Sequence, residues 1–178
     1  AAKEAGSDIV FVFMSWGTEF ATQPTNQQYE IADFLFENGA DIIIGGHCRV
    51  PQPMELRTVK DADGNERTGF ICYSLGNFSF GGNKEVRALE TVVVDVALTF
   101  DDAGNYLGQQ LTLYPANISG TYPENNDQPV LVSGDAAQDV MALIQNDTDY
   151  ELAPYTDEAG CAQQPYLPRK AQDHTSNI

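Results

Sequence analysis

Two short segments of the chain place polar side chains directly after an apolar run of strand length. Ser15-Trp-Gly-Thr-Glu19 follows the run at residues 8–14, and Gly45-Gly-His-Cys-Arg49 follows the run at residues 41–44. Short apolar runs are typical of strands buried in a parallel sheet, and ligand sites lie at the carboxyl ends of such strands. We therefore expect the two loops to lie side by side. An imidazole, a carboxylate and a guanidinium would then be available for acid–base chemistry or ligand binding.

Several residues in and near these loops have a structural alternative to a functional role. His47 is either a satisfied structural histidine or a ligand and acid–base group. Trp16 and Phe20 either pack beneath the loops, which is the expectation, or offer a stacking platform. Asn77 either hydrogen-bonds a ligand or is a turn residue that tolerates positive φ. Cys48 is expected to be an inert buried cysteine rather than a reactive thiol.

The segment between the two apolar runs has the features of a helix. Thr25-Asn-Gln-Gln28 has the form of a capping box, in which a Thr hydroxyl and a Gln side chain satisfy free backbone N–H groups. Ile31, Phe34 and Leu35 follow at helical spacing, and Gly39 is a suitable stop. A strand, a helix and a second strand form a β-α-β crossover, which is right-handed by expectation.

The rest of the chain favours antiparallel strands. A first hairpin is predicted with strands at 54–59 and 68–73 around the aspartate-rich turn Asp61–Asn65. A second is predicted with strands at 90–100 and 107–113 around the turn Asp101–Asn105. A short helix is then expected at 135–144. The first turn has some likeness to a calcium loop, but its glycine is misplaced and no glutamate closes it, so a hairpin turn is expected. The predicted fold class is α/β, with a domain over residues 1–145 and an irregular tail over residues 146–178.

Charge and composition exclude several classes of protein. The 178 residues carry 9 basic and 26 acidic side chains, a net charge of −17, so we expect no nucleic-acid partner. No apolar run approaches the roughly 20 residues that a membrane-spanning helix needs. The three cysteines match neither a zinc pattern nor a disulfide framework.

Several motifs, in this order and spacing, resemble one bacterial family. They are the run at 8–14, Trp16-Gly-Thr-Glu-Phe20, the segment 38–45 with His47, and Tyr73-Ser-Leu-Gly-Asn-Phe78. Together they look like the carboxyl-terminal half of the CapA poly-γ-glutamate capsule-synthesis family, strongly over residues 8–80 and more loosely to about 114. The resemblance implies a calcineurin-like metallophosphoesterase fold. It also implies that the amino-terminal half of the domain, which carries Gly-Asp, Asn-Leu-Glu and Asn-x-x-His motifs in the family, is missing here. That missing half is an expected partner of this chain.

The chain departs from the family pattern at two expected metal ligands. Ser15 stands where relatives have the His of His-Trp-Gly, and Arg49 stands where they have the second His of His-Pro-His. A hydroxyl is a poor ligand for transition metals, and a guanidinium cannot coordinate one. Either the site has lost its metals and Arg49 binds a carboxylate or phosphate directly, or a reduced site still holds manganese, zinc or iron in the full-length protein. We expect no metal bound to this chain alone.

The resemblance assigns a role to each candidate residue. His47 and Glu19 are the candidate catalytic residues, with His47 also a candidate metal ligand, and Arg49, Ser15, Trp16 and Asn77 are the candidate ligand-binding residues. The implied function is the making, export or anchoring of poly-γ-glutamate by a membrane-anchored protein at the bacterial cell surface. An active phosphoesterase joined to its missing half, and a non-catalytic module that binds an anionic polymer or another capsule-machinery subunit, are the alternatives.

Overall fold

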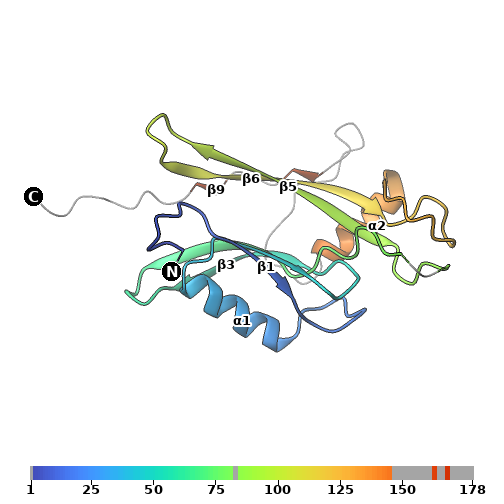
Figure 1. Cartoon of the computed structure of the whole chain (residues 1–178), viewed down its shortest axis with the longest axis horizontal. Coiled ribbons are helices and arrows are strands. Elements are labelled where there is room, and N and C mark those ends of the chain that lie inside the picture. The colour runs from blue at the N-terminus through green and yellow to red at the C-terminus, as the bar shows by residue number, and fades with distance from the viewer. Residues whose placement is uncertain (1, 82–83, 146–161, 164–166, 169–178) are drawn as a thin grey trace, which may run out of the picture.

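A computed structural model describes residues 2–81, 84–145, 162–163 and 167–168. Its strands form two sheets that lie over one another as layers (Figure 1). The first sheet has four strands, and the second is built on a long antiparallel hairpin with further short strands beside it. The strands of the first sheet are, in spatial order, β1 (Phe11–Ser15), β2 (Ile42–Gly46), β4 (Glu66–Cys72) and β3 (Met54–Lys60). The α/β fold class is confirmed, and the two layers are consistent with the metallophosphoesterase-like sandwich.

The β-α-β crossover is present as predicted. Helix α1 (Asn26–Glu37) connects β1 to β2, which pair in parallel along their whole length. The capping box at its start is complete, because Thr25 Oγ1 accepts from the Gln28 N–H and the Gln28 side chain accepts from the Thr25 N–H. The first strand begins at residue 11 rather than 8, since the N–H of Val10 is taken by the Asp41 carboxylate at 2.8 Å.

The hairpin of β3 and β4 is also confirmed, with Met54 opposite Cys72 and Lys60 opposite Glu66. The same β4 strand pairs in parallel with β2, so it joins the crossover and the hairpin into one mixed sheet. The sequence predicts a parallel first half and an antiparallel second half. The parallel pairing of β4 therefore extends the parallel part of the sheet beyond the crossover.

The second sheet is built on a long hairpin of β5 (Glu90–Phe100) and β6 (Tyr106–Asn117). The face of β5 that carries alternating apolar residues is buried only near the start of the strand: Val92 is 3% exposed, whereas Leu98 and Phe100 are 36% and 44% exposed. The far end of the hairpin diverges from the first sheet (Figure 1). Strand β7 (Val130–Leu131) pairs with the end of β6, and α2 (Gly134–Gln145) follows close to the predicted bounds.

Most of the predicted irregular tail lies outside the described residues. Within it, β8 (Ala162–Gln163) and β9 (Leu167–Pro168) are described, and both pair with β6. In the described part of the chain, neither helix is both long and apolar enough to cross a membrane.

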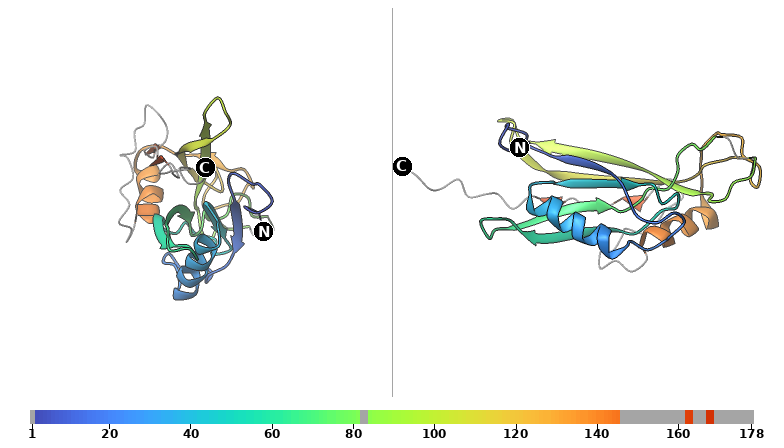
Figure 2. Two further views of the ribbon diagram at one scale, coloured as in Figure 1. Left: turned by 90° about the vertical axis from the view of Figure 1, so that its left-hand side faces the viewer. Right: turned by 60° about the horizontal axis from the view of Figure 1, so that its bottom comes forward.

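Alternate residues of the central strands fill two separate cores. Ile42, Phe70 and Cys72 face the second sheet and α2, and Ile43 and Ile71 face α1. Helix α1 covers the outer face of the first sheet, and the second sheet lies across the inner face (Figures 1 and 2). Each fully buried apolar side chain of this size stabilises the fold by about 1.5–3 kcal/mol. The central strands are thus held on both faces, which fixes where their carboxyl ends point.

Candidate functional site

The loops that follow β1 and β2 lie side by side, as the sequence predicts. Two backbone hydrogen bonds join them, one from the Trp16 N–H to the Gly46 carbonyl at 3.2 Å and one from the Phe20 N–H to the Cys48 carbonyl at 2.7 Å. The parallel register places Ser15 opposite Gly46, so the loops leave the sheet at the same level. We call these segments, residues 16–25 and 47–53, the paired loops.

The backbone of the paired loops adopts conformations that side chains disfavour. Phe20, His47 and Arg49 have φ values of 61°, 88° and 66°, and Asp127 is the one other non-glycine with positive φ in the described part of the chain. A left-handed conformation costs a residue with a Cβ roughly 1–2 kcal/mol. Three such residues in two adjoining loops need surrounding contacts to hold them, and residues of this kind cluster at functional sites.

Two buried glutamines hold the first of the paired loops in place. Gln52 is fully buried, and its amide donates to the carbonyls of Ala21 and Gln23, both at 3.0 Å. Its side-chain oxygen accepts from the Gln28 amide at 2.9 Å. Sequence analysis identified Gln28 only as a capping residue and missed Gln52, which lies between two prolines in a segment without periodicity.

The side chain of Trp16, the first residue of the paired loops, packs into the core on the α1 side of the first sheet. Its side chain is 7% exposed, its indole N–H donates to the Tyr73 carbonyl at 2.8 Å, and its ring stacks on that of Tyr73 at 6.1 Å between centroids. Gly45 makes this packing possible, because a Cβ there would lie 2.0 Å from the Tyr73 carbonyl oxygen. Core packing is thus its observed role, and direct contact with a ligand stays a prediction.

Cys48 is buried between the two loops as a free thiol. Its Sγ donates to the Trp16 carbonyl at 3.3 Å. Burial raises the pKa of the Cys48 thiol, so the protonated form dominates at neutral pH. Because the thiolate is the reactive species, the expectation of an inert cysteine is supported.

Arg49 and Glu19 form an ion pair between the two loops. The Nε and Nη2 atoms of Arg49 lie 3.2 Å and 3.0 Å from Glu19 Oε1. Both side chains remain partly in contact with water, so the pair contributes little stability, about 0–1 kcal/mol. The guanidinium also lies 4.7 Å from the centroid of the Phe80 ring, which restricts its position further.

A small pocket opens beside this ion pair. It has a volume of about 10 Å³, enough for about one water, and its lining residues include Phe20, Arg49, Asn77, Phe80 and Arg87. Ser15 and His47 are exposed at the strand ends. The structure thus brings together Arg49 and Asn77 in one pocket, with Glu19 paired to Arg49.

Asn77 does not adopt the positive φ that was the structural alternative to a ligand-binding role. Positive φ falls on Gly76, at 81°, and Asn77 has none. Asn77 lines the pocket with a side chain that carries two donors and an acceptor. Phe80 and Arg87 were missed by sequence analysis, because they lie in a loop with no pattern that points to a site.

The residues present do not by themselves form the two-metal centre that the fold family implies. Such a centre needs several imidazole and carboxylate ligands around cations about 3.5–4 Å apart. Among the described residues, no group of three or more His, Cys, Asp or Glu side chains is placed to hold a metal. Glu19 and His47 are the two candidate site residues that could ligate a metal, and the Glu19 carboxylate is already paired with Arg49.

Comparison with known proteins agrees with this fold and these loops. The chain belongs to the α/β class, with a parallel crossover and a second sheet. Residues 1–82 match the family described as bacterial capsule synthesis protein PGA_cap. The chain is 36% identical over 78 residues to the capsule biosynthesis protein CapA of Bacillus anthracis. It is 39% identical over 126 residues to the PGA biosynthesis protein CapA of Bacillus subtilis strain 168. The resemblance to the CapA-like capsule synthesis family is thereby confirmed.

These matches cover unequal shares of the chains compared. They include 44% and 71% of this chain but only 17% and 30% of the two relatives' own lengths. This chain therefore corresponds to a minor part of the relatives it matches, and it contains both paired loops and the pocket beside them.

Proposed function

We propose that this chain is part of a protein that acts in poly-γ-glutamate capsule biosynthesis, in the making, export or anchoring of the polymer. The names of the two relatives support this function. Because a capsule surrounds the cell, we place the domain outside a bacterium, attached to the membrane by other parts of the full-length protein. Other subunits of the capsule machinery are its expected partners.

Arg49 carries the proposal for the site itself. It lies at the pocket in a left-handed conformation, and its guanidinium is held by Glu19 and by the Phe80 ring. A guanidinium binds carboxylates and phosphates through a planar fork of donors. A chain with a net charge of −17 repels a polyanion overall, so binding of one requires a local cation. We infer that Arg49 is that cation and that the ancestral metal site is degenerate.

An active metal-dependent phosphoesterase is the second candidate function. His47 favours it, because its imidazole is exposed at the carboxyl end of β2, where a ligand from another part of the protein could join it. In that case, the double variant Ser15→His/Arg49→His should take up metal readily. Failure of this double variant to bind manganese, zinc or iron would count against a merely decayed centre.

The test of anion binding is a titration of the full-length protein with a γ-linked glutamate oligomer. Arg49→Ala should weaken binding about tenfold or more, the effect of losing one charge-assisted hydrogen bond. Lys60→Ala is the matched control, because it removes one positive charge from the exposed end of β3, at the opposite end of the first sheet. Equal binding by the wild-type protein and Arg49→Ala would contradict the proposal, and so would equal losses in both variants.

A further inference from the structure

A second arginine lies at the same pocket as Arg49. The guanidinium carbon of Arg87 is 4.6 Å from the centroid of the Phe20 ring, and that of Arg49 is 5.9 Å from the same centroid. Because both cations lie on one ring, they are within about 11 Å of each other. Phe20 thus supports both guanidinium groups through its face, an interaction worth roughly 0.5–1 kcal/mol at exposed sites.

Arg87 differs from the other described arginines in its charge environment. Arg49, Arg57 and Arg67 each form an ion pair with an acidic side chain. No carboxylate of the described residues pairs with Arg87, which is exposed and lines the pocket together with Glu85. In an acidic chain with only 9 basic residues, an arginine without such a pair is available to an anion from outside.

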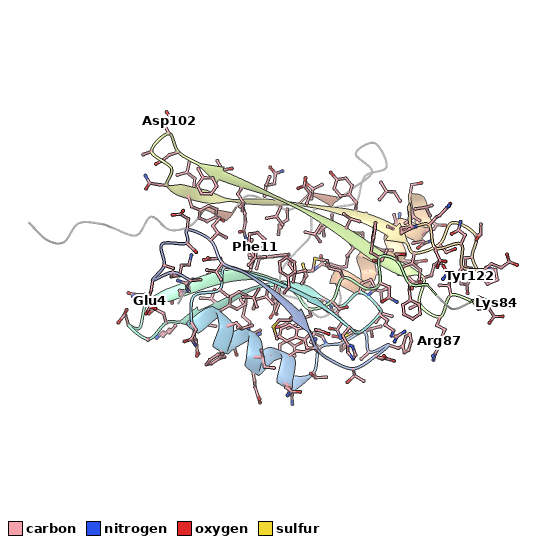
Figure 3. The ribbon with its side chains drawn as sticks, in the orientation of Figure 1. Glu4, Phe11, Lys84, Arg87, Asp102 and Tyr122 are labelled. Atoms are coloured by element: carbon pink, nitrogen blue, oxygen red, sulfur yellow. The ribbon has the colours of Figure 1, made fainter. Side chains whose placement is uncertain are left out.

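The segment that carries Arg87 is held by defined backbone contacts. The N–H of Val86 donates to the Pro123 carbonyl at 3.1 Å, and the N–H of Asn125 donates to the Lys84 carbonyl at 3.0 Å. The Asn125 side chain donates to the Phe80 carbonyl at 2.7 Å. Figure 3 shows Lys84, Arg87 and Tyr122 together at one end of the molecule, with Asp102 and Glu4 at the other. These contacts hold in place the backbone of the segment from which the Arg87 side chain extends.

We propose that Arg49 and Arg87 bind two carboxylates of one ligand at the same time, with Phe20 between them as the supporting surface. The inference rests on the proposed function, because that function supplies the class of ligand. In γ-linked glutamate, successive α-carbon atoms are separated by five bonds of about 1.5 Å each. The separation of two neighbouring α-carboxylates is thus comparable to the upper limit of the distance between the two guanidinium groups. The small volume of the pocket admits carboxylate oxygens rather than the body of a ligand.

The experiment compares two neighbouring cations in the full-length protein. Arg87→Ala should weaken the binding of a γ-linked glutamate oligomer about tenfold, as expected for a lost charge-assisted contact. Lys84→Ala is the matched control, because Lys84 is exposed in the same segment but does not line the pocket. Its affinity should stay within about twofold of the wild-type value, as for an exposed charge that is screened by salt. Equal losses in the two variants would show a general charge effect and overturn the proposal.

A second measurement separates this proposal from the function on which it rests. Binding by the wild-type protein should weaken with added salt more steeply than binding by Arg87→Ala, because two cations contribute rather than one. Loss of affinity in Arg49→Ala but not in Arg87→Ala would leave the proposed function standing and overturn the two-arginine site. Binding of inorganic phosphate without binding of the oligomer would overturn the carboxylate assignment. Binding of neither probe would overturn both proposals.

Discussion

The two ends of the molecule are organised in different ways (Figure 1). At one end, the turn Asp61–Asn65 closes the β3–β4 hairpin, and the turn Asp101–Asn105 closes the β5–β6 hairpin in the same manner. In each, an aspartate Oδ1 accepts from the backbone N–H groups two and four residues later, at 2.8–3.0 Å. Left-handed φ falls on a glycine, Gly64 or Gly104. The residues of these two turns are thus ones that favour the backbone conformations they adopt.

The paired loops at the other end depend on contacts between residues distant in sequence. Left-handed φ falls on Phe20, His47 and Arg49, and the contacts that hold these loops join residues about thirty positions apart. The difference shows where the chain departs from the conformations its residues prefer. That departure coincides with the pocket and with Arg49, which is the pattern expected of a functional site.

The largest expected effect comes from a pair of glycines, one at each end. Gly17 and Gly104 have φ values of 82° and 85°, but a Cβ at Gly17 would lie 2.6 Å from Cys48 Sγ, whereas one at Gly104 meets open space. Gly17→Ala should lower the free energy of unfolding by about 3 kcal/mol, from backbone strain and overpacking together, and Gly104→Ala by only about 1 kcal/mol. Urea unfolding of both variants measures the difference, and equal losses would remove the distinction between the two ends.

A smaller effect is expected from the buried glutamine that holds the first loop. Gln52→Leu leaves the Ala21 and Gln23 carbonyls without their donor, which should cost about 2 kcal/mol. Gln110→Leu is the control, because Gln110 is exposed on β6 and its replacement should stay within about 0.5 kcal/mol. Unfolding measurements that place both variants near the wild type would show that the paired loops do not depend on Gln52.

The dependence of stability on pH should also separate the two ends. Hydrogen bonds from Asn65 and Asn105 lower the pKa of Asp61 and Asp101, so their contribution is present above about pH 4 and is lost as the pH falls. Burial raises the pKa of Cys48, so its contribution is present at neutral pH and is lost as the pH rises above about 9.

Unfolding measured across this pH range in the wild type and in Cys48→Ala tests the alkaline side. The variant should lose less stability on going to alkaline pH than the wild type does. Asp101→Asn, a change at the other end, should leave the alkaline side unchanged. A steeper alkaline loss in Cys48→Ala than in the wild type would contradict the placement of the thiol.

Much of the fold could be predicted because its signals are local. The capping box at Thr25 and Gln28, the stop at Gly39 and the two aspartate-rich turns act within a few residues of themselves, and each is confirmed. The adjacency of the paired loops followed from a rule about parallel strands. The alternation of apolar residues along β5 shows which of them share a face, but not which of them the first sheet covers.

The rest could not be predicted because it depends on which segments meet. Neither the parallel pairing of β4 with β2 nor the burial of Gln52 leaves a periodic trace in the sequence. Arg87 lies 38 positions after Arg49, and only the fold brings both to Phe20. The candidate site was thus predicted from its loops, while the second cation and the supporting amides required the structure.

The central claim is that the paired loops carry their positive charge in the chain, as Arg49, rather than in bound metal ions. This can be measured by elemental analysis of the full-length protein, purified without chelator or added metal. We predict close to zero equivalents of manganese, zinc or iron, and none taken up on titration. About two equivalents, the content of a two-metal phosphoesterase centre, would contradict it.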